Sequence, residues 1–544
     1  MFVSTGSSGK RANFEETLHT PIPEKGHLWV PETLPTVSWP DASRPLWEFV
    51  SAAISPLIGA DCSVPCRNAL HEFPIALEQE TRSIAALQLH RGPTLSFKDV
   101  GCSVAAELHR AFLPDKKNTR VIVATSGDTG SAAAHAFENI CVLYPEGRVS
   151  PFQERQMLQC KHATCLAVPE DFDACQRIAK RILREQRALS CNSVSLARLL
   201  PQIGMYAWAA AQRPHHIYFV PSGNYGNAVA CLMAKRMGAP IESVHMACNA
   251  NGTALVRFLN GQDYVPSATV QTPATAMDVG NPSNAVRLFH CMKSGNSRDV
   301  VASVVPNESI AAMADKTVCP HTACALHAAV RLGAPGSIIV RTADVKKFTY
   351  IQQSNARSPL VLHKPHALQK TCSTVLLVGM PGMGKTTLSF MMGGHDSDCT
   401  MIADRGKRNL PEVIASFDTT DAFIEYEGQT VIRMLDAVEP TAAGAAVIAT
   451  GGSAVHSAPL REYLTDNNDN VLIVWLSREK ATPTDWSARG VVTPAHTPVT
   501  SPQQLEHLRN PLYAALADLE LRTDLWDAQR SALALQSILR FFNE

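Results

Sequence analysis

The sequence contains no apolar run long enough to cross a membrane. Apolar runs such as Val375–Val378 and Val471–Leu476 are far shorter than the ~20 apolar residues that a transmembrane helix requires. The opening residues, MFVSTGSSGKRANFEE, have no apolar core ahead of the first acidic residues, unlike a secretory signal. We therefore expect a cytoplasmic protein without a membrane partner.

The chain also lacks an excess of charge of either sign. Its 49 Lys and Arg residues balance 49 Asp and Glu residues, and the pI is about 7.3. Binding to nucleic acid requires a concentrated cationic face, so the balance excludes a dedicated nucleic-acid binder. We expect small-molecule substrates, and a monomer or a homodimer.

Cysteine patterns that bind metal are missing as well. The 15 cysteines are scattered, and no CxxC pair occurs. Cys62 and Cys66 are spaced CxxxC, and no Cys/His set has the spacing of a zinc site. Free cysteine is among the most buried residue types, so we predict buried thiols.

Apolar β-rich runs alternate with segments of helical period along the chain. Such alternation is typical of α/β proteins with largely parallel sheets. The 544 residues exceed a typical single domain of ~100–200 residues, which predicts two or three folding units. The predicted strands are Val121–Ala124, Ile217–Val220, Val244–Ala247 and Ile338–Arg341, and the predicted helices include Cys175–Glu185 and Ala228–Met237.

A change of composition divides the chain near residue 370. Residues 352–370 are polar, contain proline and have no clear period, and a further strand is predicted at Thr374–Val378. We therefore predict a first region over residues 1–355, a linker over 356–372 and a second region over 373–544.

Three segments of the first region have the composition of a cofactor site. Lys98 lies in HRGPTLSFKDVG, and partly apolar surroundings would lower its pKa. Only a neutral amine attacks an aldehyde to form a Schiff base. Residues 121–137 and 219–238 each place a strand, a glycine-rich turn and a helix in succession, an arrangement that binds anions through backbone N–H groups.

These segments resemble the threonine synthases, which are pyridoxal-phosphate enzymes of fold type II (tryptophan synthase β-like). The family motifs HGPTxxFKD, TSGDTG and TGNFGN have counterparts here in the same order. The resemblance spans roughly residues 1–350. Further matching segments are GHLWVPE (26–32), YPEGRVSPFQERQM (144–157), NSVSLARLLPQI (192–203), AMDVGNPSN (276–284) and CPHTA (319–323).

The resemblance implies roles for residues of this chain. Lys98 would be the catalytic lysine that holds pyridoxal 5′-phosphate and then shuttles protons. Asp128 would lie near the phenolic oxygen of the cofactor, and Thr342 near its pyridine nitrogen. The cofactor phosphate would lie against Ser222, Gly223, Asn224, Tyr225, Gly226 and Asn227. The substrate, whose phosphate suits arginine forks, would contact Thr125, Ser126, Gly127, Thr129, Arg148, Ser150, Gln153, Asn192 and Arg198.

The implied reaction converts O-phospho-L-homoserine and water to L-threonine and phosphate. The chain departs from the family pattern where Ser195 replaces an asparagine, Leu196 a tryptophan and Asp344 a histidine. A phospho-lyase that releases 2-oxobutyrate and ammonia needs the same lysine and loops. Threonine and 2-oxobutyrate therefore both stay open as products.

The second region begins with a phosphate-binding motif. In TVLLVGMPGMGKTTL, residues 374–388, backbone N–H groups of the loop would cradle phosphates, Lys385 would reach the terminal phosphates and Thr386 would ligate magnesium. We predict that ATP and Mg²⁺ bind here. The predicted ATP-binding residues are Gly379, Gly382, Gly384, Lys385, Thr386 and Thr387, with Thr386 as the metal ligand.

The rest of this region resembles shikimate kinase, a P-loop kinase, over about residues 373–525. The family segments GExxFR, ATGGG and RxPxY have counterparts at 428–433, 449–453 and 509–513. Counting from Lys385 places Asp404 at the second carboxylate of the family's DxD pair and Ile402 at the first. Arg489 is the one remaining arginine of the lid. The implied acceptor site consists of Asp404, Arg433, Gly451, Gly452 and Arg509.

Three interpretations of the second region stay open. It could phosphorylate a small hydroxy acid such as shikimate. It could phosphorylate homoserine, which would supply the substrate implied for the first region. It could instead be a regulatory nucleotide-binding module without catalysis, which the altered DxD pair and lid favour. A chain in which neither region is catalytic is disfavoured by the intact Lys98 and the two anion-binding loops.

Overall fold

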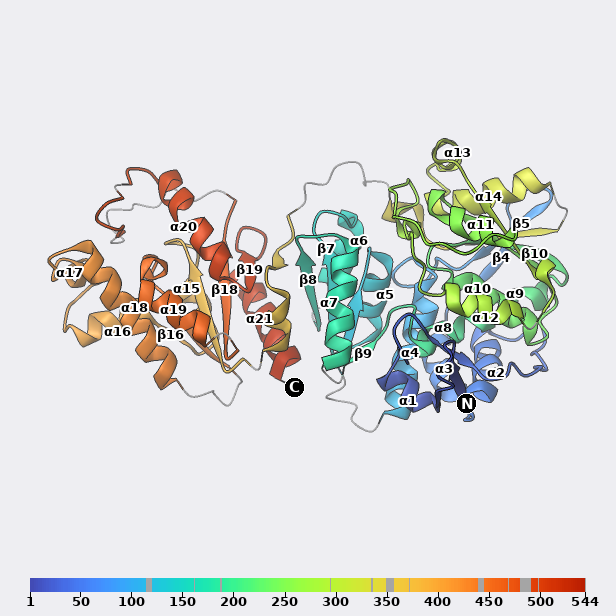
Figure 1. Cartoon of the computed structure of the whole chain (residues 1–544), viewed down its shortest axis with the longest axis horizontal. Helices are drawn as coiled ribbons and strands as arrows, with labels where there is room; N and C mark the ends of the chain where they lie inside the picture. The colour runs from blue at the N-terminus through green and yellow to red at the C-terminus, as the bar shows by residue number, and fades with distance from the viewer. Residues whose placement is uncertain are drawn as a thin grey trace. The chain divides into compact units, whose positions relative to one another are not determined.

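The structure is a computed structural model that divides into two compact units (Figure 1). The first unit comprises Met1–Tyr144, Arg148–Ala163 and Ala179–Asn355, and the second comprises Pro145–Gly147, Thr164–Ile178 and Ala356–Glu544. The described residues are 1–113, 120–160, 162–185, 188–293, 295–333, 336–348, 357–370, 372–438, 445–467, 469–479, 491–497 and 499–543.

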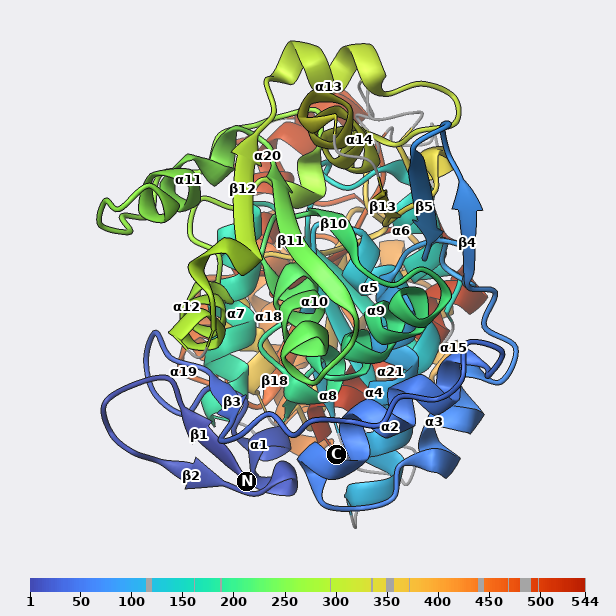
Figure 2. The same ribbon diagram turned by 90° about the vertical axis from the view of Figure 1, so that its right-hand side faces the viewer.

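A six-stranded sheet forms the larger layer of the first unit, with β12 at one edge and β4 at the other (Figure 2). Neighbouring strands pair in parallel except β4 and β5, which are antiparallel. The central strands β10 and β13 are almost wholly apolar and buried, as strands covered on both faces must be. The order is β12 (Val300–Val304), β11 (Ile241–Cys248), β10 (His216–Pro221), β13 (Ser337–Arg341), β5 (Ile84–Gln88) and β4 (Ala76–Gln79).

A smaller parallel group in the same unit has β6 (Val121–Ala124) between β9 (Leu189–Ser190) and β7 (Ile140–Pro145). At the N-terminus, β1 (Phe2–Ser4) pairs antiparallel with β2 (Arg11–Ala12) and β3 (Trp29–Pro31). The helices of this unit are α1 (Phe14–His19), α2 (Leu46–Ile58), α3 (Ser63–Leu70), α4 (Lys98–Phe112), α5 (Asp128–Ala136), α6 (Pro151–Leu158), α8 (Leu196–Leu199), α9 (Pro201–Gln212), α10 (Gly226–Arg236), α11 (Thr253–Leu259), α12 (Ala285–Lys293), α13 (Asn307–Met313) and α14 (Pro320–Leu332).

The second unit is built on a sheet whose core strands β16, β17, β15, β18 and β19 pair in parallel. Their bounds are β15 (Thr374–Gly379), β16 (His395–Asp396), β17 (Ala446–Ala449), β18 (Val471–Ser477) and β19 (Leu519–Arg522). The helices are α15 (Lys385–Met391), α16 (Ser397–Asp404), α17 (Leu410–Ile414), α18 (Thr420–Ala437), α19 (Ala458–Asp466), α20 (Pro502–Leu516) and α21 (Ala528–Asn543).

The predicted linker contains regular structure in its described part. Strand β14 (Leu360–Leu362) pairs antiparallel with β19 and also pairs with β8 (Ala163–Val168), and a 3₁₀ helix covers Pro365–Gln369. The three apolar residues of β14 are buried, which explains why this short run joins the sheet of the second unit despite its polar flanks.

The α/β class and the strands and helices predicted from periodicity are confirmed. For example, the predicted helix Cys175–Glu185 lies within α7 (Phe172–Glu185). Thirteen of the cysteines are buried free thiols, whereas Cys160 is half-buried and Cys399 is exposed. Among the described residues, no helix is both long and apolar enough to cross a membrane.

Candidate functional sites

The carboxyl ends of three neighbouring parallel strands bring the predicted cofactor residues of the first unit together. Lys98 follows β5, Thr342 follows β13, and the 222–227 loop follows β10. Strands β5, β13 and β10 are adjacent and parallel, so their carboxyl ends lie at one edge of the sheet. Ligands of open α/β sheets bind at such edges.

The segment that carries Lys98 is hydrogen-bonded to the segment after β13. The N–H of Phe97 donates to the carbonyl of Thr342 at 2.9 Å, and the N–H of Asp344 donates to the carbonyl of Leu95 at 3.1 Å. Leu95 has a φ of 60°, a conformation that costs a non-glycine residue energy and that clusters at functional sites. The lysine is therefore held by a strained loop against the end of a central strand.

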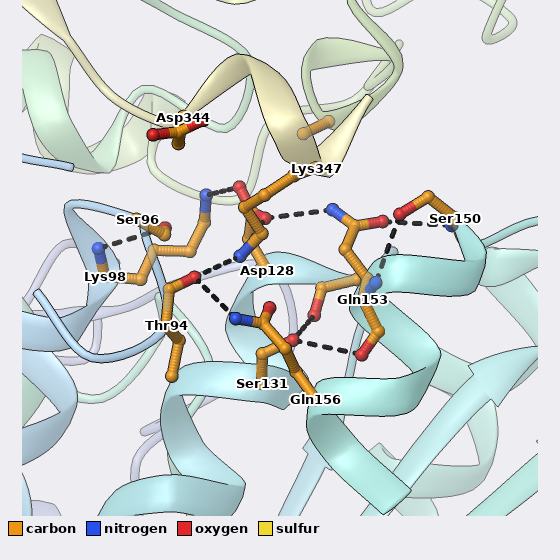
Figure 3. A network of polar contacts seen from close by, with 12 residues as sticks. Thr94, Ser96, Lys98, Asp128, Ser131, Ser150, Gln153, Gln156, Asp344 and Lys347 are labelled. Carbon is orange, nitrogen blue, oxygen red and sulfur yellow. Dashed lines mark hydrogen bonds and ion pairs between the residues drawn. The ribbon is translucent and has the colours of Figure 1, made fainter. Parts of the chain in front are cut away.

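Asp128, the first residue of α5, is the centre of a polar network around Lys98. Figure 3 shows that the side chains of Lys98 and Lys347 are both directed at its carboxylate, at 3.2 and 2.8 Å. Gln153 donates to the same carboxylate at 2.9 Å. Lys347 also donates to the carbonyl of Thr94 at 2.7 Å and is fully buried. One carboxylate is thus shared by two amines, of which that of Lys347 is fully buried and that of Lys98 is half-buried.

Burial and the neighbouring cations set the protonation of this network. Burial lowers the pKa of Lys98, the carboxylate of Asp128 opposes this shift, and Arg198 and Lys347 add to it. For Asp128, burial favours the neutral form, but Lys347 and Lys98 outweigh it and hold its pKa below the usual range. The lowered pKa of Lys98 increases the fraction of neutral amine, the form that attacks a carbonyl group.

The 222–227 loop has the geometry of a phosphate cradle. It leads into α10, whose first N–H groups have no partner within the helix. A Cβ at Gly223 would lie 2.6 Å from the Cα of Met277, so only glycine lets the loop pass there. Among the residues that the structure describes, the buried Nδ2 of Asn227 has no hydrogen-bond partner, while its Oδ1 accepts from Tyr206. Unsatisfied donors at a helix N-terminus beside an amine fit a cofactor that carries a phosphate and an aldehyde.

The 125–129 turn is stabilised by its own threonine. The hydroxyl of Thr125 accepts from the N–H groups of Gly127 and Gly130, both at 2.9 Å. Asn192 holds the strand before the turn through both polar groups of Ala124, and Arg198 donates to the hydroxyl of Thr129 at 3.2 Å. The turn, Asn192 and Arg198 are therefore brought together.

The other residues predicted to bind substrate either hydrogen-bond to one another or lie at the surface. Ser150 caps α6, and the side chain of Gln153 returns to the N–H of Ser150, so both have structural partners. Arg148 is exposed, and Ser126 is half-buried. Of the two predicted arginines, Arg198 is buried within the network, and its Nε has no hydrogen-bond partner in the described part of the chain.

The departures from the family pattern have local structural roles. Ser195 directly precedes α8 at the N-cap position, without a side-chain capping bond, and Leu196, the first residue of the helix, is almost fully buried in the core. Asp344 caps a short 3₁₀ helix, Val345–Lys347, by accepting from the N–H of Lys346 at 2.8 Å. This cap precedes Lys347 by three residues and so helps to direct Lys347 towards Asp128.

Two residues that sequence reasoning missed organise this site. Lys347 lies in TADVKKF, residues 342–348, whose counterpart in the family is TAHPAKF. That pattern has a lysine at the position of Lys347 and an alanine at that of the exposed Lys346, so the match could have identified Lys347. Arg287 is fully buried and donates to the carbonyls of Trp29, Ser193 and Val194 at 2.7–2.9 Å, so it holds the NSVS segment in place. Burial lowers the pKa of Arg287 to about 9.

The phosphate-binding loop of the second unit lies between β15 and α15. Lys385 is buried, and its ammonium donates to the carbonyls of Gly379 and Met380 at 2.7 and 3.0 Å. Burial lowers its pKa to about 8. The helix then starts directly at Lys385, so its N-terminal N–H groups face the loop. This is the strand, loop and helix context that the motif requires.

The carboxylates beside this loop differ from those predicted. The hydroxyl of Thr386 donates to Asp396 at 2.6 Å, and the second carboxylate, Asp398, follows two residues later. The prediction of Asp404 by counting from Lys385 is therefore wrong. Helix α15 ends at Met391, and Gly393, with a φ of 73°, turns the chain into β16, so the DxD pair comes earlier than the count assumed.

Asp404 lies at the other end of α16, where it pairs with Arg433 at 3.0 Å. The side chains of Arg433 and Asp404 are 59% and 39% exposed, so this pair faces solvent, unlike the buried Asp396 that accepts from Thr386. The predicted lid residue Arg489 lies outside the described residues.

Gly451, Gly452 and Arg509 do lie together near the loop. A Cβ at Gly452 would approach Nη1 of Arg509 to 2.8 Å, and one at Gly451 would approach Asp398 and Glu427. Arg509 is 1% exposed, and its Nε contacts His456 at 3.3 Å. Glu427, which no motif indicated, is also buried and accepts a hydrogen bond from Ser453.

Comparisons with known proteins identify a family for each of the two regions of the chain. Residues 72–339 match the pyridoxal-phosphate dependent enzyme family, and residues 381–540 match the shikimate kinase family. The threonine synthase of Haemophilus influenzae is 36% identical over 309 residues, which cover 52% of this chain and 72% of that protein. That of Serratia marcescens is 40% identical over 40% of this chain and 55% of its own length.

Solved structures of threonine synthases are also similar to this chain. The crystal structure of threonine synthase from Escherichia coli is 30% identical, with a TM-score of 0.59, over 64% of this chain and 89% of that one. The pyridoxal-phosphate-bound threonine synthase of Brucella melitensis is 28% identical, with a TM-score of 0.57, over 64% and 90%. The chain therefore belongs to the threonine synthase family of pyridoxal-phosphate-dependent enzymes and carries a shikimate kinase family domain at its C-terminal side.

Proposed function

We propose that the first unit converts O-phospho-L-homoserine and water to L-threonine and phosphate. The observation that supports this most is the half-buried amine of Lys98, which lies at the same sheet edge as the α10 loop and is paired with the buried Asp128. Nearby, Arg198 offers a buried guanidinium with an unpartnered Nε. An amine, an anion cradle and a buried arginine suit a phosphorylated amino acid.

Each residue around Lys98 would have a separate role in this reaction. Pyridoxal phosphate, bound through Lys98 and the 222–227 loop, supplies an electron sink for carbanion chemistry. Lys98 would carry protons to and from the α and β carbons of the substrate, for which its lowered pKa is suited. Asp128 and Lys347 would hold Lys98 in position. Arg198 would bind an anionic group of the substrate.

The products formed from O-phospho-L-homoserine test this proposal. The protein loaded with pyridoxal phosphate is expected to release threonine and phosphate in equal amounts, measured by amino-acid analysis and phosphate assay. Release of phosphate with 2-oxobutyrate and ammonia would contradict the synthase reaction and establish a phospho-lyase. Absence of turnover would contradict both, and the altered segment with Ser195 and Leu196 would then be the first region to examine.

We propose that the second unit transfers phosphate from ATP to the hydroxyl of a small carboxylic acid. The contact between Thr386 and Asp396 supports this, since a hydroxyl and a carboxylate at 2.6 Å suit a hydrated Mg²⁺. Lys385 would neutralise the terminal phosphates, Asp398 would accept the proton of the hydroxyl, and Arg509 would bind the carboxylate. The intact DxD pair weakens the case for a purely regulatory module.

Loss of Lys385 tests the kinase proposal. Lys385→Ala is expected to lower acceptor-dependent ADP formation by roughly 100-fold or more, because the charge on the transferred phosphate is no longer neutralised. Lys407→Ala, an exposed site in the same unit, is expected to keep full activity. ADP formation that is equal in both variants, or that no acceptor increases, would contradict a kinase.

A further inference from the structure

The acceptor end of the second unit contains one more buried carboxylate than a hydroxy acid requires. A Cβ placed on Gly451 would lie 1.9 Å from Oε1 of Glu427 and 2.7 Å from Oδ1 of Asp398. The same construction on neighbouring Gly452 gives 2.8 Å to Nη1 of Arg509. Two carboxylates and one guanidinium therefore lie directly against two adjacent glycines, where any larger side chain would displace them.

Two of these groups have atoms without a partner. Within the described part of the chain, Oδ1 of Asp398 and Nη1 of Arg509 are buried and form no hydrogen bond. Arg509 as a whole is 1% exposed. Buried polar atoms are normally paired, so an unpaired acceptor and an unpaired donor beside the same glycine pair indicate a ligand with complementary groups.

The carboxyl group of Glu427 is held beside the glycine pair by Ser453. Glu427 is 1% exposed, and Ser453, which stands where the related kinases have a glycine, donates to its Oε2. The hydroxyl of Tyr513 donates to the carbonyl of Gly452 at 2.8 Å and so anchors the glycine pair. The carboxyl group is thus positioned by a residue in which this chain departs from the family pattern.

When each charged group beside the two glycines is assigned to a part of the proposed kinase substrates, one carboxyl group is left without a partner of opposite charge. Lys385 would be used by the ATP phosphates, Asp398 by the acceptor hydroxyl and Arg509 by the acceptor carboxylate. Glu427 then remains without a cation. Burial, and secondly Asp398, raise the pKa of Glu427 to about 8, as expected for a carboxyl group without its counter-ion. An ammonium group on the substrate would supply that counter-ion.

We propose that the acceptor of the second unit is a short α-amino acid that carries a hydroxyl group, with its ammonium at Glu427, its carboxylate at Arg509 and its hydroxyl at Asp398. This inference rests on the proposed kinase function. In the step, the hydroxyl oxygen bonds to the γ-phosphorus of ATP, the bond from that phosphorus to the β–γ bridging oxygen breaks, and ADP leaves. The hydroxyl proton passes to Asp398. The product is an amino-acid phosphate monoester, the class of compound that the first unit is proposed to consume.

A comparison of acceptors tests the role of the ammonium group. The full chain with Mg-ATP would be assayed for ADP formation with L-homoserine, with 4-hydroxybutanoate, which lacks the amino group, and with shikimate. We expect kcat/KM for L-homoserine to exceed both others by about 30-fold or more, the effect of a buried charge pair. Equal or better use of 4-hydroxybutanoate or shikimate would overturn the inference and leave the kinase function standing.

A substitution at Glu427 tests the residue itself. Glu427→Gln is expected to lower kcat/KM for L-homoserine about 30-fold and to leave that for 4-hydroxybutanoate within about twofold. Glu425→Gln, on the exposed face of the same helix, is the matched control. An equal loss for both acceptors would overturn the assignment. If Glu427→Gln does not fold, the acceptor comparison on the unaltered chain decides. If no acceptor raises ADP formation above that of Lys385→Ala, the kinase function itself fails, and the inference with it.

Discussion

Replacing Lys98 by alanine is expected to abolish turnover of O-phospho-L-homoserine. The loss should be roughly 10³-fold or more, since one amine both holds the cofactor and moves protons. The variant should also lose the visible absorbance of the bound cofactor. The variant removes one of the two cations beside the buried carboxylate of Asp128. It is expected to fold, because Lys347 still pairs with that carboxylate.

Absorbance and product assays on the same preparation separate the possible outcomes. Lys316→Ala, an exposed lysine in the same unit, should keep both absorbance and activity. If Lys98→Ala kept them, the lysine that binds the cofactor would be a different one. Lys347, the second amine at Asp128, would then be the residue to replace.

Replacing Lys347 by methionine is expected to have a large effect on stability and on the pH dependence of turnover. Asp128 is buried, and removing one of its two cations should destabilise the first unit by about 2–3 kcal/mol, somewhat less than the loss of a sole partner because Lys98 remains. Thermal or urea unfolding would measure this. The volume of the methionine side chain keeps the packing, so the loss reports the ammonium group, through both its pairing with Asp128 and its hydrogen bond to the carbonyl of Thr94.

The same substitution should shift the acidic limb of the kcat–pH profile. Lys347 lowers the pKa of Lys98, and Asp128 raises it. Without Lys347, Asp128 would act on Lys98 alone, the pKa of Lys98 would rise, and less neutral amine would exist at a given pH. The limb should therefore move to higher pH. Lys346→Met, exposed and adjacent, should change neither stability nor the profile, whereas a limb that stays in place in Lys347→Met would contradict the coupling.

Much of the fold could be predicted from the sequence because the necessary information is local. The strands at Val121–Ala124 and Ile217–Val220 are apolar runs that precede glycine-rich turns, and both occur as predicted. Lys98 and the 222–227 loop lie in ordered motifs, so their roles could be proposed without coordinates. The phosphate-binding loop before Lys385 was equally visible, since strand, glycines and helix follow one another directly.

The residues that complete each site were decided by tertiary structure. Lys347 and Lys346 are neighbours in the same polar segment, and only the packing of the short helix after β13 buries one of them against Asp128. Asp404 was predicted by a count along the chain that assumed the length of α15. Because that helix ends early, the DxD pair moves to Asp396 and Asp398. Spacing along the chain fixes position in space only where the intervening structure has the expected length.

Glu427 is a residue whose role the sequence could not indicate, because the sequence does not show which charged residues are buried. In the sequence it is one acidic residue of a helix, with nothing to distinguish it from Glu425. In the structure it is buried beside Asp398 and the glycines at 451 and 452. The sequence alone determined the fold class and the two families, and it predicted the principal lysine of each site. The tertiary structure decided which charged groups lie against one another away from solvent, because burial depends on elements distant in the chain and controls both pKa and ligand preference.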